Sequence, residues 1–206
     1  MLGVVIFLYL IWRNLRDDYH NNLLISYSWL AILSFFIFGR MTFGVVNWGV
    51  WNDSYWSWWQ FWVKTGFDYY GGIGGILLVT WLYCSQNNWK LWSFFEDITA
   101  PLCLLMSFMM VEDLIVKFNL RVLIYLLISI FGFIYSNVIA KKYRSFVWYK
   151  SGKKGFVFLF MGLIIGILLT ITSLVFMNSW ISVILNVVIS LFFLTKLISV
   201  GEVFKK

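Results

Sequence analysis

The chain has 206 residues, of which 62% are hydrophobic and only 12% are charged, and its formal net charge is +7. A soluble domain carries about 25% charged residues, and it needs polar side chains to cover its core. The composition therefore excludes a water-soluble globular protein. It predicts an all-α integral membrane protein, built as a single polytopic domain over residues 1–206.

Apolar runs separated by short charged links predict about seven transmembrane helices. The first run is short, because a span needs about 20 residues. Either the first helix is shallow, or residues before Met1 complete it. In chain order the predicted helices are 1–12, 22–39, 67–84, 98–116, 121–140, 155–177 and 180–200.

Residues 41–65, "MTFGVVNWGVWNDSYWSWWQFWVKT", are crowded with tryptophan. Tryptophan prefers the membrane–water boundary, where its ring is apolar and its N–H stays wet. We therefore expect an interfacial arm between the second and third helices.

The basic residues predict an orientation with the N-terminus outside and the C-terminus inside. This orientation places 12 of the 16 basic residues on the inner side, many of them in the basic inner link 141–154, and it satisfies the positive-inside rule. The net charge then reflects topology and contact with anionic inner lipids, and it predicts no nucleic-acid partner. The four basic residues left outside are Arg40, Lys64, Lys117 and Arg121.

The third predicted helix opens on "GFDYYGGIGGI", residues 66–76. Gly71 and Gly75 are four apart on one helix face, a spacing that lets membrane helices approach closely. Gly72 and Gly74 fall off that face, and each glycine weakens a helix by about 1 kcal/mol relative to alanine. Helix packing and close approach of a lipid headgroup are the two interpretations of this run.

The order of four segments resembles the prolipoprotein diacylglyceryl transferases of bacteria. "FGR" at 38–40 is similar to that family's Gly–Arg before an outer arm, and "YYGGIGG" at 69–75 is similar to its His–Gly–Gly–Leu signature. "FEDITAPLCLL" at 95–105 resembles its fourth-helix start, and "WYKSGKKGFVFLF" at 148–160 resembles its sixth-helix start. Seven spans and an outer arm agree with the same family.

The resemblance implies transfer of a diacylglyceryl group from phosphatidylglycerol to the thiol of a lipobox cysteine in a prolipoprotein signal peptide. It implies a bacterial cytoplasmic (inner) membrane location, contact with membrane lipids, and no metal or soluble cofactor. The family's histidine is replaced here by Tyr70, and its later arginines are missing. The chain's single histidine, His20, falls in the first inner link.

The candidate site therefore consists of a few outer residues. Tyr70, in the former base position, and Arg40 are the candidate catalytic residues. Arg40 is also a candidate phosphate ligand, although it can equally be an interfacial anchor. The remaining candidates for substrate or lipid binding are Asp68, Tyr69, Gly71 and Gly72.

A catalytically degenerate member that binds lipid or lipoprotein precursor without chemistry is the alternative. A transporter is less favoured, because there is no internal repeat. The polar residues within the spans are expected to bond between helices; they are Ser129, Asn186, Ser190 and Thr195.

Carboxylates and thiols elsewhere have structural interpretations. Glu96 and Asp97 are expected in the first turn of the fourth helix, where they complement the helix dipole. Cys84 and Cys103 lie in apolar runs, which favours packing over a disulfide or a metal site.

Overall fold

A computed structural model describes residues 2–46, 67–116, 118–146, 149, 153–176 and 180–201. Within these residues the regular structure is entirely helical, as the composition predicts. The elements are α1 (Leu2–Leu15), α2 (Asn21–Val46), α3 (Tyr69–Gln86), α4 (Leu91–Val116), α5 (Leu120–Lys142), the 3-10 turn η3 (Tyr143–Ser145), α6 (Phe156–Val175) and α7 (Trp180–Gly201).

Five of the described helices are long and apolar enough to cross a membrane, and α3 is not among them. This pattern is that of an all-α membrane protein, because a backbone in lipid must satisfy its own hydrogen bonds and helices do so. The five candidate spans are Asn21–Val46, Leu91–Val116, Leu120–Lys142, Phe156–Val175 and Val183–Val200.

Two predicted boundaries are wrong. Helix α2 continues through residues 41–46, which the sequence analysis assigned to the interfacial arm, and the rest of the arm lies outside the described residues. Helix α4 begins at Leu91 rather than at residue 98, so Pro101 lies well inside the helix and not near its start.

The chain divides into two compact units, which we describe separately. One contains residues Trp12–Leu91, and the other contains Met1–Ile11 together with Trp92–Lys206. The second of these units contains most of α1, all of α4 except Leu91, and α5, α6 and α7.

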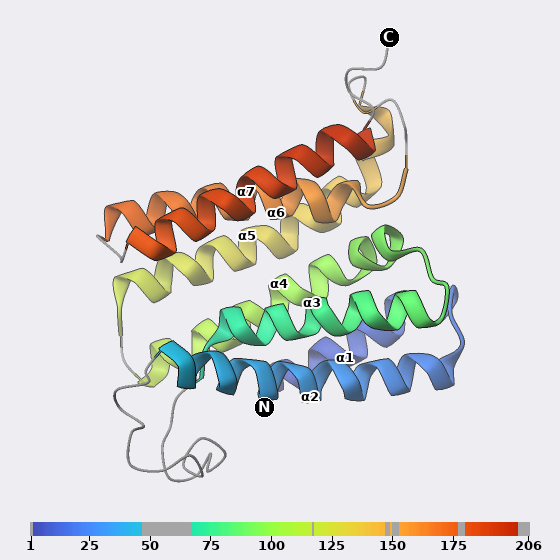
Figure 1. The fold of residues 1–206 in the computed structure, drawn as a ribbon, viewed down its shortest axis with the longest axis horizontal. Helices are drawn as coiled ribbons and strands as arrows, with labels where there is room; N and C mark the ends of the chain where they lie inside the picture. Colours follow the sequence, from blue (N-terminus) through green and yellow to red (C-terminus); the bar gives the residue numbers. More distant parts are fainter. Residues whose placement is uncertain are drawn as a thin grey trace. The chain divides into compact units, whose positions relative to one another are not determined.

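In the unit Trp12–Leu91, α2 and α3 run antiparallel and pack along each other (Figure 1). Their interior is small and apolar, with two tyrosines that make polar contacts between the helices. The Tyr27 hydroxyl and Thr80 Oγ1 share a hydrogen bond of 2.8 Å, and the Tyr83 hydroxyl donates to the carbonyl oxygen of Leu23 at 2.9 Å. Buried hydroxyl groups need such partners, so these bonds favour one register of α3 on α2.

In the other unit, α6 packs against both α5 and α7 (Figure 1). Asn186 Nδ2 on α7 donates to Ser173 Oγ on α6 at 3.1 Å, which confirms the expected interhelical role of that asparagine. The hydroxyls of Ser129, Ser190 and Thr195 instead donate to carbonyl oxygens of their own helices. For these three the predicted bond between helices is wrong, because an acceptor three or four residues back on the same helix is nearer.

Candidate functional site

The first two segments that resemble the transferase family, residues 38–40 and 69–75, lie at the same end of the α2–α3 pair. The Asp68 amide donates a hydrogen bond to the Gly39 carbonyl oxygen at 3.1 Å. Because α2 and α3 are antiparallel, the last turns of α2 and the first turns of α3 meet at one end of the helix pair (Figure 1). We call this region, residues 38–46 and 67–75, the α2–α3 end.

Gly71 and Gly75 are the points of closest approach between these helices. A Cβ at Gly71 would lie 1.9 Å from Thr42 Oγ1 and 2.8 Å from the Phe38 carbonyl oxygen. A Cβ at Gly75 would lie 2.7 Å from the Ser34 carbonyl oxygen. The predicted packing face is therefore confirmed, and only glycine fits at these two positions without a shift of α2.

Gly72 and Gly74 differ from each other, contrary to the prediction that both lie off the packing face. Gly72 is buried, and a Cβ there would lie 2.7 Å from the Phe35 ring and 3.1 Å from the Phe67 ring. Gly74 has no atom within 4 Å of a Cβ position. The prediction for Gly72 is wrong because the contact face of α3 is wide, with helix α2 on one side and the Phe67 ring on the other.

Phe67 completes the packing at this end, and the sequence analysis did not single it out. Its ring fills the space over Gly39, where a Cβ would lie 2.2 Å from the ring. The ring also packs 4.9 Å from the Phe35 ring and 5.5 Å from the Tyr69 ring, centre to centre. A phenylalanine directly before a glycine-rich helix start was the signal available in the sequence.

Arg40 is almost fully buried, with 3% of its surface exposed. It lies within α2 rather than at the helix end, so the prediction that it closes the helix is wrong. Its guanidinium carbon is 5.9 Å from the centre of the Phe43 ring. A charged side chain inside an apolar protein is costly and marks a position of functional interest.

Asp68 has a defined structural role. It is the N-cap of α3, and its Oδ1 accepts a hydrogen bond from the Tyr70 amide at 2.9 Å. An N-cap carboxylate satisfies an amide that the helix start would leave without a partner. The Tyr70 side chain is 49% exposed, whereas Tyr69 is partly buried against Phe67.

The single histidine lies far from this end. His20 directly precedes α2 and Arg40 is 20 positions further along the chain. At about 1.5 Å per helical residue the two are about 30 Å apart. In the described part of the chain there is no group of three or more His, Cys, Asp or Glu side chains that could hold a metal ion.

The other described arginine on the predicted outer side, Arg121, interacts with the end of α6. Its Nη2 donates to the Phe176 carbonyl oxygen at 3.4 Å, and its guanidinium lies 5.4 Å from the centre of the Phe176 ring. A cation at a helix C-terminus complements the dipole, so Arg121 stabilises the end of α6.

Glu96 is a further residue whose role the sequence analysis missed. Because α4 begins at Leu91, Glu96 is not in its first turn, and the predicted dipole role is wrong for Glu96 and for Asp97. Glu96 Oε2 instead accepts a hydrogen bond from the Gly155 amide at the start of α6. This bond joins α4 to α6.

No known family model matches the chain, and no curated protein matches it either. The described helices define the class, which is an all-α, multi-pass membrane protein.

Proposed function

We propose that this chain is a divergent prolipoprotein diacylglyceryl transferase that acts at the outer face of a bacterial cytoplasmic membrane. The observation that carries this proposal is the bond between the Asp68 amide and the Gly39 carbonyl. It joins two segments that resemble the family's motifs and are about thirty residues apart in the sequence. A buried arginine stands next to the junction.

The proposed reaction is a displacement at a glyceryl carbon of phosphatidylglycerol. The thiolate of a lipobox cysteine attacks this carbon, a C–S bond forms, and the C–O bond to phosphate breaks. Glycerol phosphate leaves with the electron pair, and the thiol proton passes to a base. Such a step needs a cation to stabilise the charge that develops on the leaving phosphate and a base to generate the thiolate.

Arg40 supplies the cation in this proposal. Its planar guanidinium can hold a phosphate through two parallel hydrogen bonds. Because only 3% of its surface is exposed, the groups that cover it must move aside when the lipid enters. A phosphate bound there interacts with Arg40 away from water, where charge-assisted contacts are strongest.

Tyr70 stands at the family's base position, beside the capping carboxylate of Asp68. A phenol has an ordinary pKa of about 10, so Tyr70 accepts a thiol proton only as the phenolate. Tyr69, Gly71 and Gly72 shape the surface next to it. In this proposal Gly71 and Gly72 act by setting the spacing of α2 and α3, through the contacts with Thr42 and Phe35.

The proposal includes the seven-span topology, with the N-terminus outside and the C-terminus inside. The 12 to 4 division of the 16 basic residues supports it. In this topology the α2–α3 end faces the outer leaflet, where a secreted precursor presents its cysteine.

The test is complementation of a bacterial strain depleted of its own transferase, with the lipobox thioether detected by mass spectrometry. Loss of one charge-assisted contact costs about 1.5–3 kcal/mol, which lowers turnover by one to two decades. Arg40→Ala should therefore reduce the amount of thioether about ten- to hundredfold, whereas His20→Ala should not alter it. An unchanged amount of thioether in Arg40→Ala would contradict the assignment of Arg40.

A second candidate function is binding of phosphatidylglycerol or precursor without chemistry. One observation favours it, namely that the carboxylate of Asp68, which neighbours Tyr70, is already engaged as the cap of α3 through the Tyr70 amide. Under this alternative the wild-type chain binds phosphatidylglycerol, and Arg40→Ala weakens binding, but no thioether forms. The two functions are thus separated by one assay.

A further inference from the structure

Exposed cations gather at the loop that joins α5 to α6, in the unit containing Trp92–Lys206. Some lie at the end of α5 and on η3, and others lie directly before α6. They are Lys141, Lys142, Arg144, Lys153 and Lys154, and we call them the α5–α6 cation surface.

The described part of this loop is folded by its own hydrogen bonds. The Phe146 amide donates to the Tyr143 carbonyl oxygen at 3.1 Å, and the Tyr149 amide donates to the Phe146 carbonyl oxygen at 3.0 Å. The Tyr149 hydroxyl donates to the Lys153 carbonyl oxygen at 2.7 Å. These bonds tie the backbone before α6 to the segment that follows α5.

Three buried aromatic rings support the loop from beneath. Tyr143 and Tyr149 are 2% exposed and Phe156 is fully buried. The Tyr143 ring stacks on Phe156 at 5.3 Å, and the Tyr149 ring lies 4.5 Å from it, centre to centre. The Arg144 guanidinium is 5.9 Å from the centre of the Tyr143 ring. The backbone that bears the cations is therefore held by the packing of these buried rings.

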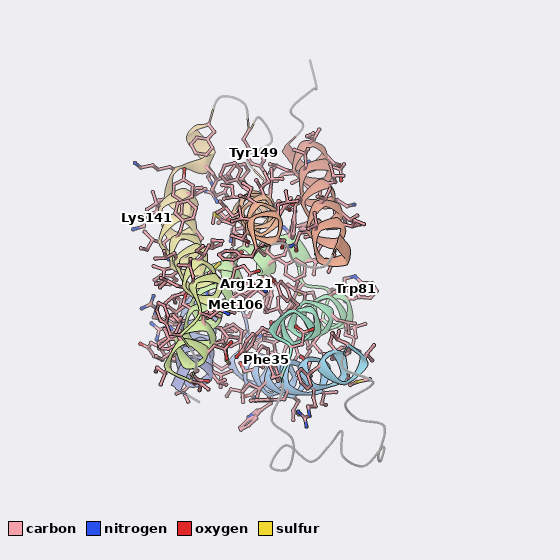
Figure 2. The ribbon with its side chains drawn as sticks, turned by 90° about the vertical axis from the view of Figure 1, so that its left-hand side faces the viewer. Phe35, Trp81, Met106, Arg121, Lys141 and Tyr149 are labelled. Atoms are coloured by element: carbon pink, nitrogen blue, oxygen red, sulfur yellow. The ribbon has the colours of Figure 1, made fainter. Side chains whose placement is uncertain are left out.

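The side chains divide accordingly between interior and surface. Tyr149 lies inward, between α5 and α6, whereas Lys141 lies on the outer side of α5 (Figure 2). Burial raises the pKa of the Tyr143 hydroxyl above its usual value, so at neutral pH this ring adds no negative charge to the surface.

Acidic side chains are scarce in this part of the sequence. No Asp or Glu occurs from residue 114 to residue 201. The carboxylate of Glu96 reaches the loop from α4, and its Oε2 accepts a hydrogen bond from the Gly155 amide. Among the residues that the structure describes in the α5–α6 loop, positively charged side chains therefore outnumber carboxylates.

We propose that the α5–α6 cation surface binds the headgroup of a phospholipid that carries two phosphates. The candidate spans Leu120–Lys142 and Phe156–Val175 end and begin at this surface, so its cations lie at the depth of lipid phosphates. Lysine and arginine at this depth attract anionic lipid headgroups. One phosphate lies by the α5 side and η3, and the other lies by Lys153 and Lys154.

This binding is separate from the proposed transfer of a diacylglyceryl group. It involves other helices, it includes none of the candidate transfer residues, and it holds whether or not the chain is a transferase. A diphosphate lipid bound here would join the ends of α5 and α6 and stabilise the folded protein, by an amount that increases with the logarithm of the lipid concentration above its dissociation constant.

The experiment measures lipid binding to the purified full-length protein in detergent by native mass spectrometry. The probes are cardiolipin, which has two phosphates, and phosphatidylglycerol, which has one. The triple variant Arg144→Gln/Lys153→Gln/Lys154→Gln should bind cardiolipin at least about tenfold more weakly than the wild type. The matched control Arg13→Gln/Arg16→Gln/Lys90→Gln also removes three exposed cations, and it should bind cardiolipin within about twofold of the wild type.

A further variant separates geometry from charge. Tyr149→Phe keeps the net charge but removes the bond to the Lys153 carbonyl, and it should weaken cardiolipin binding about threefold or more. Equal losses in the triple variant and the matched control would overturn the proposal, since net charge alone would then explain binding. An unchanged affinity in the triple variant would overturn it as well.

Two more measurements complete the test. Competition by inorganic pyrophosphate at micromolar concentration would overturn the lipid assignment, because the ligand would then be a soluble diphosphate. The triple variant should keep its cardiolipin-free unfolding temperature and lose the rise that cardiolipin gives the wild type. A fall in the cardiolipin-free temperature with an intact rise would overturn the proposal in favour of a structural role.

Discussion

The contact of α3 with α2 can be tested by two alanine substitutions in one helix. At Gly71 a Cβ would lie 1.9 Å from Thr42 Oγ1 and 2.8 Å from the Phe38 carbonyl oxygen, whereas at Gly74 no atom lies within 4 Å. The Phe38 oxygen belongs to the backbone, so rotation of a side chain cannot relieve the whole clash. We therefore compare Gly71→Ala with Gly74→Ala.

The expected magnitude follows from cancellation of the helix propensities. Each substitution gains up to about 1 kcal/mol of propensity, because alanine replaces glycine inside the same helix. Only Gly71→Ala has an overpacking cost, which is typically 1–3 kcal/mol. The free energies of unfolding of the two variants should therefore differ by about 1–3 kcal/mol, with Gly74→Ala the more stable.

The assay is reversible unfolding in mixed micelles, followed by circular dichroism and by the fluorescence of the tryptophans. Gly74→Ala serves as the control for propensity, and the wild type as the reference. Equal stabilities of the two variants would refute the reasoning, because α2 and α3 would then not be in contact at Gly71.

Three other predictions test the caps and the topology. Asp68→Ala should cost about 1 kcal/mol of stability, while Asp68→Asn should keep both the stability and any diacylglyceryl transfer. Loss of transfer in a folded Asp68→Asn variant would show that the carboxylate acts chemically. Glu96→Ala should lower the free energy of unfolding by about 1–3 kcal/mol, because the Gly155 amide loses its acceptor. Glu96→Gln keeps an acceptor oxygen, so it should retain most of the wild-type stability. Thermal unfolding of both variants checks this. In intact cells a membrane-impermeant maleimide should label Asn119→Cys and not His20→Cys, and the reverse pattern would overturn the orientation.

The helices were largely predictable from the sequence. Long apolar runs leave a lipid-embedded backbone no alternative to helix, and a helix lies at each of the seven predicted positions. The end of α2 was misplaced because Gly39 and Arg40 have the pattern of a helix stop at the interface. The apolar residues 41–46 continue the helix, and Gly39 is packed beneath the Phe67 ring.

The start of α4 was misplaced for a related reason. Proline is common in the first turn of a helix, and acidic residues also favour that turn, so Pro101 with Glu96 and Asp97 suggested a late start. Glu96 is held instead by a partner on another element, the Gly155 amide. A contact across about sixty residues leaves no local pattern, so sequence periodicity could not reveal it.

The candidate site was predictable only in part. The spacing of Gly71 and Gly75 indicated a packing face, and the contacts with Thr42 and Ser34 confirm it. The burial of Gly72 depends on the ring of Phe67, which a helical wheel of α3 does not include. The burial of Arg40 was hidden as well, since an interfacial anchor and a buried cation have the same sequence pattern.

The central claim is that the α2–α3 end binds phosphatidylglycerol through Arg40 and transfers its diacylglyceryl group. The most direct measurement uses purified full-length protein in nanodiscs, phosphatidylglycerol with deuterated acyl chains, and a synthetic lipobox peptide. The account predicts that the peptide gains the mass of the deuterated diacylglyceryl group, and that Arg40→Gln forms at least tenfold less of this product. No mass gain with the wild-type protein, under conditions in which a known diacylglyceryl transferase modifies the peptide, would contradict it.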